Sequence, residues 1–478
     1  MGTKILIGLF ITTIISGMIF VKPVESKQLD WPVFQGNSAR TGNTDSGIPQ
    51  EPKLVWQLTV KNFKEKGIDP QGMNRPIIYN NKVFVSASEV AALDLNMGSF
   101  LWQYKEKNLY PSSIAAGDEK IFVVFNNSSL IKNTSQGFVY ALDEKTGDFL
   151  WKHQTQKPIS HSAPLFESGK VFVGDDSGTL YALDSKTGKL VWKKFLDAEV
   201  IHSSPAFYKG MVFIGTEGSG RSNVLPSHLF ALDVETGNVI WKFQVDFISG
   251  KANLVHGTPA ISNDVVYFGS ENGYFYALAY DNGKLILKKK ISSGDKFLVG
   301  VSAPPTLSEG KIFVTTWEGK LFSLEQKTGE IAWQKTFDES SQGGDAVAIT
   351  GNGMVCITII RGVPDKKEGK FSCFNENNGE IVWQKEFFGG TPAVASGLLV
   401  VSNMDIADGS PDNTPVLLAF SSAKNADLPQ ISKAEYNKNS TGETNWLFFA
   451  IIVIGVCFLA CLGLLIYKII KNRIIKIK

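Results

Sequence analysis

The chain has 478 residues, about three times the length of a typical single-core domain, so its length predicts either several domains or one large repetitive fold. Its 43% apolar and 20% charged residues exclude wholesale disorder and a collagen-like structure. The net charge of +2 is the balance of +1 in residues 1–26, +5 in residues 468–478 and −4 in the body between them. A mildly acidic body lacks the basic surface that binding of nucleic acid requires, which argues against that partner.

The N-terminal segment has the order of features that is typical of a secretory signal. Lys4 precedes an apolar run from Ile5 to Val21, and a polar stretch follows the run. Residues 1–26 are therefore assigned to a signal peptide or to an uncleaved signal anchor, since the run is at the short end of what spans a bilayer. Both forms predict that the rest of the chain is exported.

A repeat organises residues 27–420. The pattern Ala-Leu-Asp, three residues, Gly, three residues, Trp occurs in four nearly perfect copies, which three divergent copies follow. The positions equivalent to the Trp are 49, 41, 49, 46, 46 and 50 residues apart, and they are Trp102, Trp151, Trp192, Trp241, Leu287, Trp333 and Trp383. This spacing is typical of the four-stranded blades of a β-propeller.

Each copy is interpreted as short strands joined by tight turns. In the third copy, residues 162–166, 170–173 and 179–183 are predicted strands, and a turn from Asp184 to Gly188 leads into the strand of Trp192. The Asp carboxylate can accept hydrogen bonds from the turn, and the Gly supplies a positive φ. The Trp is large enough to wedge between neighbouring sheets, where its indole N–H needs an acceptor.

The final blade lacks its last strand at the C-terminal end of the repeat. Residues 391–401 and 416–420 supply the earlier strands, and no Gly-xxx-Trp strand follows them. Near the N-terminus, residues 52–60 contain Trp56, 46 residues before Trp102, with no Ala-Leu-Asp ahead of it. We predict that this strand completes the last blade, because an open ring would expose an edge. The expected fold class is all-β: one eight-bladed β-propeller with N- to C-terminal strand closure.

The C-terminal region predicts a membrane anchor. Residues 421–445 are rich in Ser, Asn, Lys and Thr and are interpreted as a flexible stalk. Residues 446–467 form 22 residues without a charge, bounded by Trp446 and Tyr467, and predict one transmembrane helix. Residues 468–478 carry five cations and no acid, so they predict a cytoplasmic tail. The propeller is therefore expected outside the cytoplasm of a single-pass membrane protein.

The repeat resembles a known family. Its Ala-x-Asp-xxx-Gly-xxx-Trp motif is similar to the tryptophan-docking repeat of pyrroloquinoline-quinone-type (PQQ-type) propellers, and the segments Trp31–Asn37 and Arg40–Gly42 resemble the lead-in that precedes the ring in that superfamily. The resemblance covers Trp31 to Phe420 and implies the propeller fold. It implies two kinds of function, since the superfamily holds quinoprotein dehydrogenases as well as non-catalytic assembly and surface proteins.

The dehydrogenase branch holds its quinone between a Trp and a disulfide of adjacent cysteines, with Ca²⁺ bound by acidic and amide side chains and an Asp as general base. The four cysteines of this chain include no adjacent pair. We therefore expect no catalytic residue, no cofactor and no resident metal, and PQQ with Ca²⁺ only under the alternative of a quinoprotein dehydrogenase. Cys356 and Cys373 stand on neighbouring predicted strands, where a cross-strand disulfide and two packed thiols are both compatible with the pattern.

Three of the five histidines share one position in the repeat. His161, His202 and His256 each stand three residues before a proline and just ahead of the predicted innermost strand. Their side chains should approach the mouth of the central channel, where they are candidate ligand-binding residues. Converging imidazoles can bind a metal or an anion, and three separate solvated side chains are the alternative.

The predicted function is that of a membrane-anchored extracytoplasmic propeller, a non-enzymatic binding or assembly scaffold for a protein, peptide or glycan. Its fold resembles the propeller lipoprotein of the bacterial outer-membrane barrel assembly machinery. That lipoprotein is attached through an acylated N-terminal Cys, and the first 355 residues here contain no Cys. A surface sensor is a further possibility, although a tail of 11 residues would need a partner helix to carry a signal.

Overall fold

The computed structural model describes residues 30–127, 136–197, 201–218, 226–248, 253–292, 300–337, 347–363, 366–386, 390, 392–403, 406 and 409–422. The predicted signal segment, transmembrane helix and basic tail lie outside these residues, as does all of the predicted stalk after its second residue. Among the described residues, none of the helices combines the length and the apolarity that crossing a bilayer demands.

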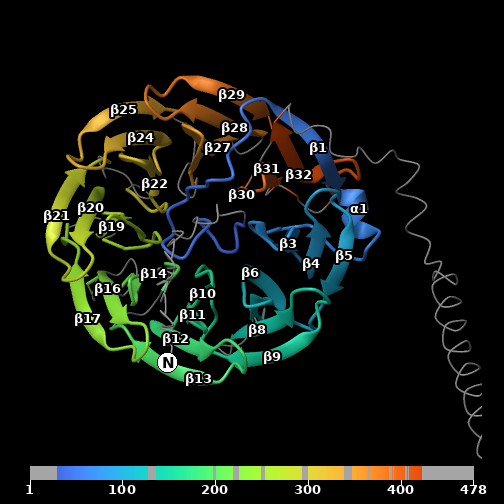
Figure 1. Cartoon of the computed structure of the whole chain (residues 1–478), viewed down its shortest axis with the longest axis horizontal. Helices are drawn as coiled ribbons and strands as arrows, with labels where there is room; N and C mark the ends of the chain where they lie inside the picture. Colours follow the sequence, from blue (N-terminus) through green and yellow to red (C-terminus); the bar gives the residue numbers. More distant parts are fainter. Residues whose placement is uncertain are drawn as a thin grey trace, which may run out of the picture. The chain divides into compact units, whose positions relative to one another are not determined.

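The described residues form eight antiparallel four-stranded sheets, the blades, arranged in a ring (Figure 1). Blades one to four hold β2 (Ile77–Tyr79), β3 (Lys82–Ser86), β4 (Val90–Asp94), β5 (Phe100–Tyr104); β6 (Tyr110–Gly117), β7 (Lys120–Asn126), β8 (Gly137–Asp143), β9 (Phe149–Gln154); β10 (Leu165–Glu167), β11 (Lys170–Gly174), β12 (Thr179–Asp184), β13 (Leu190–Phe195); and β14 (Ala206–Tyr208), β15 (Met211–Gly215), β16 (His228–Asp233), β17 (Val239–Gln244).

Blades five to eight hold β18 (Ala260–Ser262), β19 (Val265–Gly269), β20 (Tyr274–Ala279), β21 (Leu285–Lys290); β22 (Thr306–Ser308), β23 (Lys311–Thr316), β24 (Lys320–Glu325), β25 (Ile331–Thr336); β26 (Ile349–Gly351), β27 (Met354–Val363), β28 (Lys366–Asn375), β29 (Ile381–Glu386); and β30 (Ala393–Ala395), β31 (Leu398–Ser402), β32 (Pro415–Ser422), β1 (Pro52–Thr59). The eight-bladed all-β prediction is confirmed. A short helix, α1 (Val60–Lys64), follows β1 and was not predicted.

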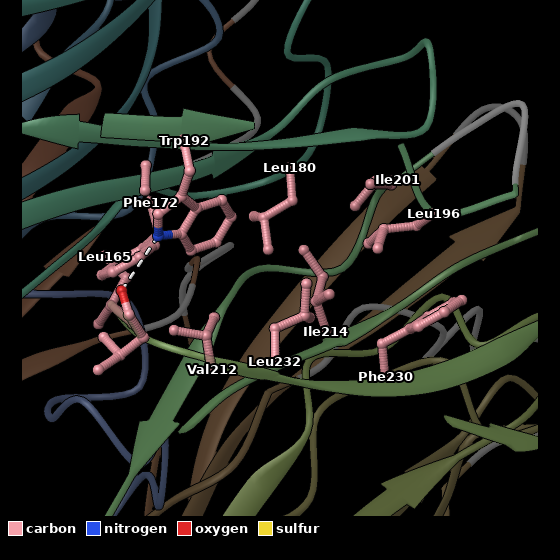
Figure 2. Close-up of a cluster of buried hydrophobic side chains, with 12 residues drawn as sticks. Leu165, Phe172, Leu180, Trp192, Leu196, Ile201, Val212, Ile214, Phe230 and Leu232 are labelled. Carbon is pink, nitrogen blue, oxygen red and sulfur yellow. Dashed lines mark hydrogen bonds between the residues drawn. The ribbon is translucent and has the colours of Figure 1, made fainter. Parts of the chain in front are cut away.

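The core lies between the blades. In blades one to six and eight the two middle strands are almost wholly buried, because both faces of a blade pack against neighbouring blades; β11 and β12 of blade three are examples. The outermost strand β13 buries Trp192 alone among its six residues. Figure 2 shows Trp192, Phe172 and Leu180 of blade three facing Val212, Ile214 and Leu232 of blade four. The apolar contact is therefore continuous from one sheet to the next.

The Trp of one blade docks on the turn of the next blade, and Trp383 docks on the segment just ahead of β1. Each indole N–H donates to a backbone carbonyl there at 2.8 to 3.1 Å, as predicted from the need of a buried indole for an acceptor. The pairs are Trp56–Leu95, Trp102–Glu144, Trp151–Ser185, Trp192–Val234, Trp241–Tyr280, Trp333–Glu376 and Trp383–Pro49. Between blades five and six the equivalent residue is Leu287, which fills the space against Gly329 without a donor.

The ring closes as the sequence predicts. β1 pairs antiparallel with β32, and Trp56 lies opposite Ala419. The first strand of the ring therefore completes the last sheet, in the order β1-β32-β31-β30. The indole of Trp383 then reaches the carbonyl of Pro49, just ahead of β1, at 2.9 Å.

The lead-in ahead of β1 crosses the middle of the ring (Figure 1). Its backbone forms hydrogen bonds with the innermost strands of six blades in turn. The partners in blades one, two, four, five, six and seven are Ile78, Ala116, Phe207, Ile261, Leu307 and Thr350. The fully buried Arg40 donates to the carbonyls of Phe34, Pro164 and Pro205. Burial lowers the pKa of Arg40 to about 9, which reflects the cost of removing a cation from water. The lead-in is thus a structural part of the propeller.

A disulfide joins Cys356 of β27 to Cys373 of β28. The two residues are direct partners in the register of these strands. Both side chains are fully buried within blade seven. Of the two arrangements open from sequence, the structure has the bonded one.

The glycine that lies under six of these Trp rings gives a test of this packing. Gly188 has a φ of +68°, and a Cβ there would stand 2.4 Å from the Trp151 ring; Gly169 has the same φ, +69°, with nothing within 4 Å of its Cβ position. Gly169→Ala should lower the free energy of unfolding by about 1–2 kcal/mol, which is the cost of placing a Cβ in the left-handed backbone region. Gly188→Ala should cost about 1–3 kcal/mol more because the ring must move. Urea unfolding of both variants measures the difference, and equal losses would contradict the docking role.

The turn carboxylates give a test by pH. Asp184 accepts hydrogen bonds from the backbone N–H and the hydroxyl of Thr187, and these bonds lower the pKa of Asp184; similar bonds lower the pKa of Asp143 and Asp233. A lowered folded-state pKa means stability that is present above the ordinary Asp range and lost as the pH falls below about 4.

The triple variant Asp143→Asn/Asp184→Asn/Asp233→Asn should therefore lose less unfolding free energy than the parent between pH 7 and pH 3. At pH 7 its cost should stay below about 1 kcal/mol per site, because exposed charges are well solvated. Blade seven offers the reverse exchange, since Asn375 occupies this position and accepts from Asn377 N–H. Asn375→Asp should steepen the pH dependence, and an unchanged slope in both variants would contradict the assignment.

Candidate functional site

The three candidate histidines come from consecutive blades and meet at one place. His161, His202 and His256 precede β10, β14 and β18. Their ring centroids lie 4.4 Å (His161–His202), 5.1 Å (His202–His256) and 6.1 Å (His161–His256) apart. The structure thus brings together three imidazoles that the repeat places in equivalent positions. That they bind a ligand stays a prediction.

A fourth residue, Glu217, belongs to this group and was not found from the sequence. Its Oε1 lies 2.9 Å from Nδ1 of His202 and 2.5 Å from Nδ1 of His256. The side chain is only 6% exposed, whereas those of His202 and His256 are 22% and 26% exposed. Burial alone would raise the pKa of Glu217, but the hydrogen bonds and charges of the two histidines outweigh it and lower that pKa to about 2. Glu217 is therefore ionised at neutral pH.

The position of Glu217 explains why it was missed. It stands two residues after β15, in a Gly-rich loop outside the repeated motif. The equivalent positions, two residues after β19 and directly after β23, hold Glu271 and Trp317, and both line the same cavity. A comparison of the residue that follows the second strand of each blade would have found Glu217 from the sequence.

The cluster lines a cavity of about 320 Å³. Phe34 of the lead-in, Arg75, Glu271 and Trp317 contribute to the same wall. The Arg75 guanidinium stacks over the Phe34 ring at 4.4 Å from its centroid. The described residues that line the cavity include two carboxylates and one guanidinium, so with neutral imidazoles the site carries one net negative charge.

The donor set decides which groups the cavity suits. Imidazole nitrogens suit transition metals, whereas Ca²⁺ takes oxygen ligands throughout. The disulfide of this chain joins strands within blade seven, and neither of its cysteines lines the cavity. The described residues therefore do not fit a quinone held against a disulfide with Ca²⁺ beside it, and no catalytic step is derived through such a pair.

Comparison with known proteins locates the chain among propellers. A sequence model of the family described as outer membrane protein assembly factor BamB matches residues 135–348 and 293–424. BamB of Legionella pneumophila (strain Paris) is 30% identical over 100 residues, which are 21% of this chain and 24% of that protein. The chain thus aligns with about a quarter of the length of this curated relative.

Solved structures share the fold at low sequence identity. BamB from Moraxella catarrhalis superposes with a TM-score of 0.58 at 17% identity, over 77% of this chain and 99% of that one. A europium-containing methanol dehydrogenase gives 0.62 at 14% identity, over 83% and 98%. A quinohemoprotein alcohol dehydrogenase from Pseudomonas putida HK5 gives 0.61 at 14%, over 85% and 81%. At these identities the likeness shows the fold alone.

The resemblance inferred from the repeat is therefore confirmed. The two matches of the family model together span residues 135–424, more than half of the sequence. The chain belongs to the family of PQQ-like β-propeller proteins that the BamB model describes.

Proposed function

We propose that this chain is a non-enzymatic propeller that binds a protein partner outside the cytoplasm and is tethered to the membrane by residues 446–467. The family supports a binding role, since its description is that of an assembly factor. The poor fit of the cavity to a quinone and Ca²⁺ favours binding over the dehydrogenase alternative. The tether and the export rest on the charge and hydropathy of the two chain ends.

The observation that carries the proposal is a belt of exposed apolar side chains around the ring. They stand on the outermost strands of blades one to seven, just before the position of the docked Trp, and are 37% to 57% exposed. The belt consists of Leu101, Phe149, Leu150, Leu190, Val191, Val239, Ile240, Leu285, Ile286, Ile331, Ile381 and Val382. Figure 1 shows the strands that carry them (β5, β9, β13, β17, β21, β25 and β29) at the circumference.

These strands are also the edges of their sheets, because each is the last in its strand order. An edge strand presents unpaired backbone N–H and C=O groups on which another strand can form. Lysines such as Lys193 and Lys194 on β13 discourage unselective pairing of such edges. An extended segment of a protein, which offers both backbone groups and apolar side chains, suits this belt better than a glycan does.

Photo-crosslinking tests the proposal in the native membrane. A photoreactive residue in place of Val191, Ile240 or Ile286 of the full chain should give an adduct of one discrete mass with a protein partner. Replacing the neighbouring exposed residue (Leu190→Asp for Val191) should remove the adduct, because a charge disfavours an apolar contact. Lys194→Ser on the same strand is the control and should keep it. Failure of all outer strands to crosslink would reject the belt as the docking surface.

The dehydrogenase alternative is tested separately. The purified full chain, incubated with pyrroloquinoline quinone and Ca²⁺, should not reduce a dye with alcohols or sugars as substrates. The cofactor should also keep its free absorbance spectrum, because the described cavity lacks the disulfide that would stack on it. Steady turnover dependent on both additions would overturn the non-enzymatic assignment.

A further inference from the structure

We propose that His161, His202, His256 and Glu217 form a binding site for a divalent transition metal of the zinc class. This site is separate from the apolar belt, and it does not depend on the proposed protein partner. The argument rests on the spacing of the rings, the identity of the donor atoms, the charge of the cavity and its access to solvent.

The ring spacing suits a single shared ion. A tetrahedral metal holds imidazole nitrogens at about 2.0–2.1 Å, which puts each ring centroid about 3.2 Å from the ion and two centroids about 5.2 Å apart. The three measured separations of 4.4, 5.1 and 6.1 Å bracket that value. His161 is not in the group of residues whose donor atoms all lie within 4.8 Å of one another, so its exposed ring has to rotate toward the ion to become a ligand.

Glu217 supplies the fourth donor. One donor atom from each of His202, Glu217 and His256 lies within 4.8 Å of the other two. In the structure the two Nδ1 atoms face Oε1 of Glu217 at hydrogen-bond distance. Donor atoms around a tetrahedral ion stand about 3.3 Å apart for bonds of about 2.0 Å. A slight widening of this hydrogen-bonded group therefore lets a metal ion replace the protons that the carboxylate now shares.

The electrostatics favour a cation. Glu217 and Glu271 line the cavity with Arg75 as their counter-charge, so neutral imidazoles leave one net negative charge. A divalent ion reverses that sign and compensates the buried carboxylate of Glu217. Three imidazoles select against Ca²⁺ and Mg²⁺, which prefer oxygen ligands. The exposed ring of His161 gives an ion a path from solvent.

The residue at the histidine position of the repeat differs between blades, and the difference fits a metal site. The same register in blades one and six holds Met73 and Val301, and both of these side chains are buried. Three adjacent blades instead hold imidazoles, and the central one adds the carboxylate. The ligands thus come from three sheets whose spacing the Trp contacts hold fixed, which is the rigidity that a metal site requires.

Metal titration tests the inference on the full chain, extracted in detergent, purified without a histidine tag and stripped with a chelator. Co²⁺ is the probe, because tetrahedral Co²⁺ absorbs visible light. We expect one Co²⁺ per chain, displaced by Zn²⁺ and retained in excess Ca²⁺. The triple variant His161→Ala/His202→Ala/His256→Ala should show no saturable binding, and Glu217→Gln should bind Zn²⁺ about 10- to 100-fold more weakly.

His153→Asn is the matched control, since His153 lies on β9 with Nδ1 bonded to the Gly188 carbonyl; it should bind as the parent does. Zn²⁺ should also raise the thermal midpoint of the parent and of His153→Asn, but not that of the triple variant, because only a folded site binds. If the triple variant does not fold, the single variant His161→Gln takes its place, because His161 is exposed and its replacement should not disturb folding. This variant should weaken Zn²⁺ binding at least about tenfold. Parent-like Zn²⁺ binding by His161→Gln and Glu217→Gln, or equal binding of Ca²⁺ by the parent, would overturn the site.

Discussion

The contact between an indole of one blade and the turn of the next is the interaction on which the rest of this structure depends. It combines an indole N–H bond to a backbone carbonyl with close packing of the ring on a glycine, as in the pair Trp192 and Gly237. The hydrogen bond sets the orientation of the indole ring. The absence of a Cβ on the glycine lets the ring lie directly against the backbone of the turn. Repeated around the ring, one local geometry sets the angle between all neighbouring sheets that use it.

Much of the fold could be predicted because this contact leaves a periodic trace in the sequence. Asp, Gly and Trp recur at a blade's spacing, and the isolated Trp56 identified the strand that closes the ring. Helix α1 was missed, since five residues are too few to establish a helical period. The state of Cys356 and Cys373 was left open, because strand pairing brings two cysteines together whether or not they are oxidised.

The candidate site was predicted in part, for a physical reason. The register of the three histidines relative to the innermost strands could be read from the repeat, and their convergence follows from the ring. Glu217 escaped notice because a single glutamate in a Gly-rich loop carries no pattern of its own. Its contact with His256 crosses from blade four to blade five, so its role depends on how neighbouring blades pack. Packing between blades leaves no mark on a single repeat.

The pairing of β1 with β32 ties the first strand of the ring to the last one made. The partner is synthesised more than 350 residues later, which at ordinary rates of about 5–20 residues per second is a wait of roughly 20 to 70 seconds. Throughout that interval Trp56 and its neighbours have no sheet to join, and the propeller cannot take its final form. The seven blades between them are each continuous in the chain, so the closed ring waits for a single late strand, and β1 stays without its partner until β32 has been made.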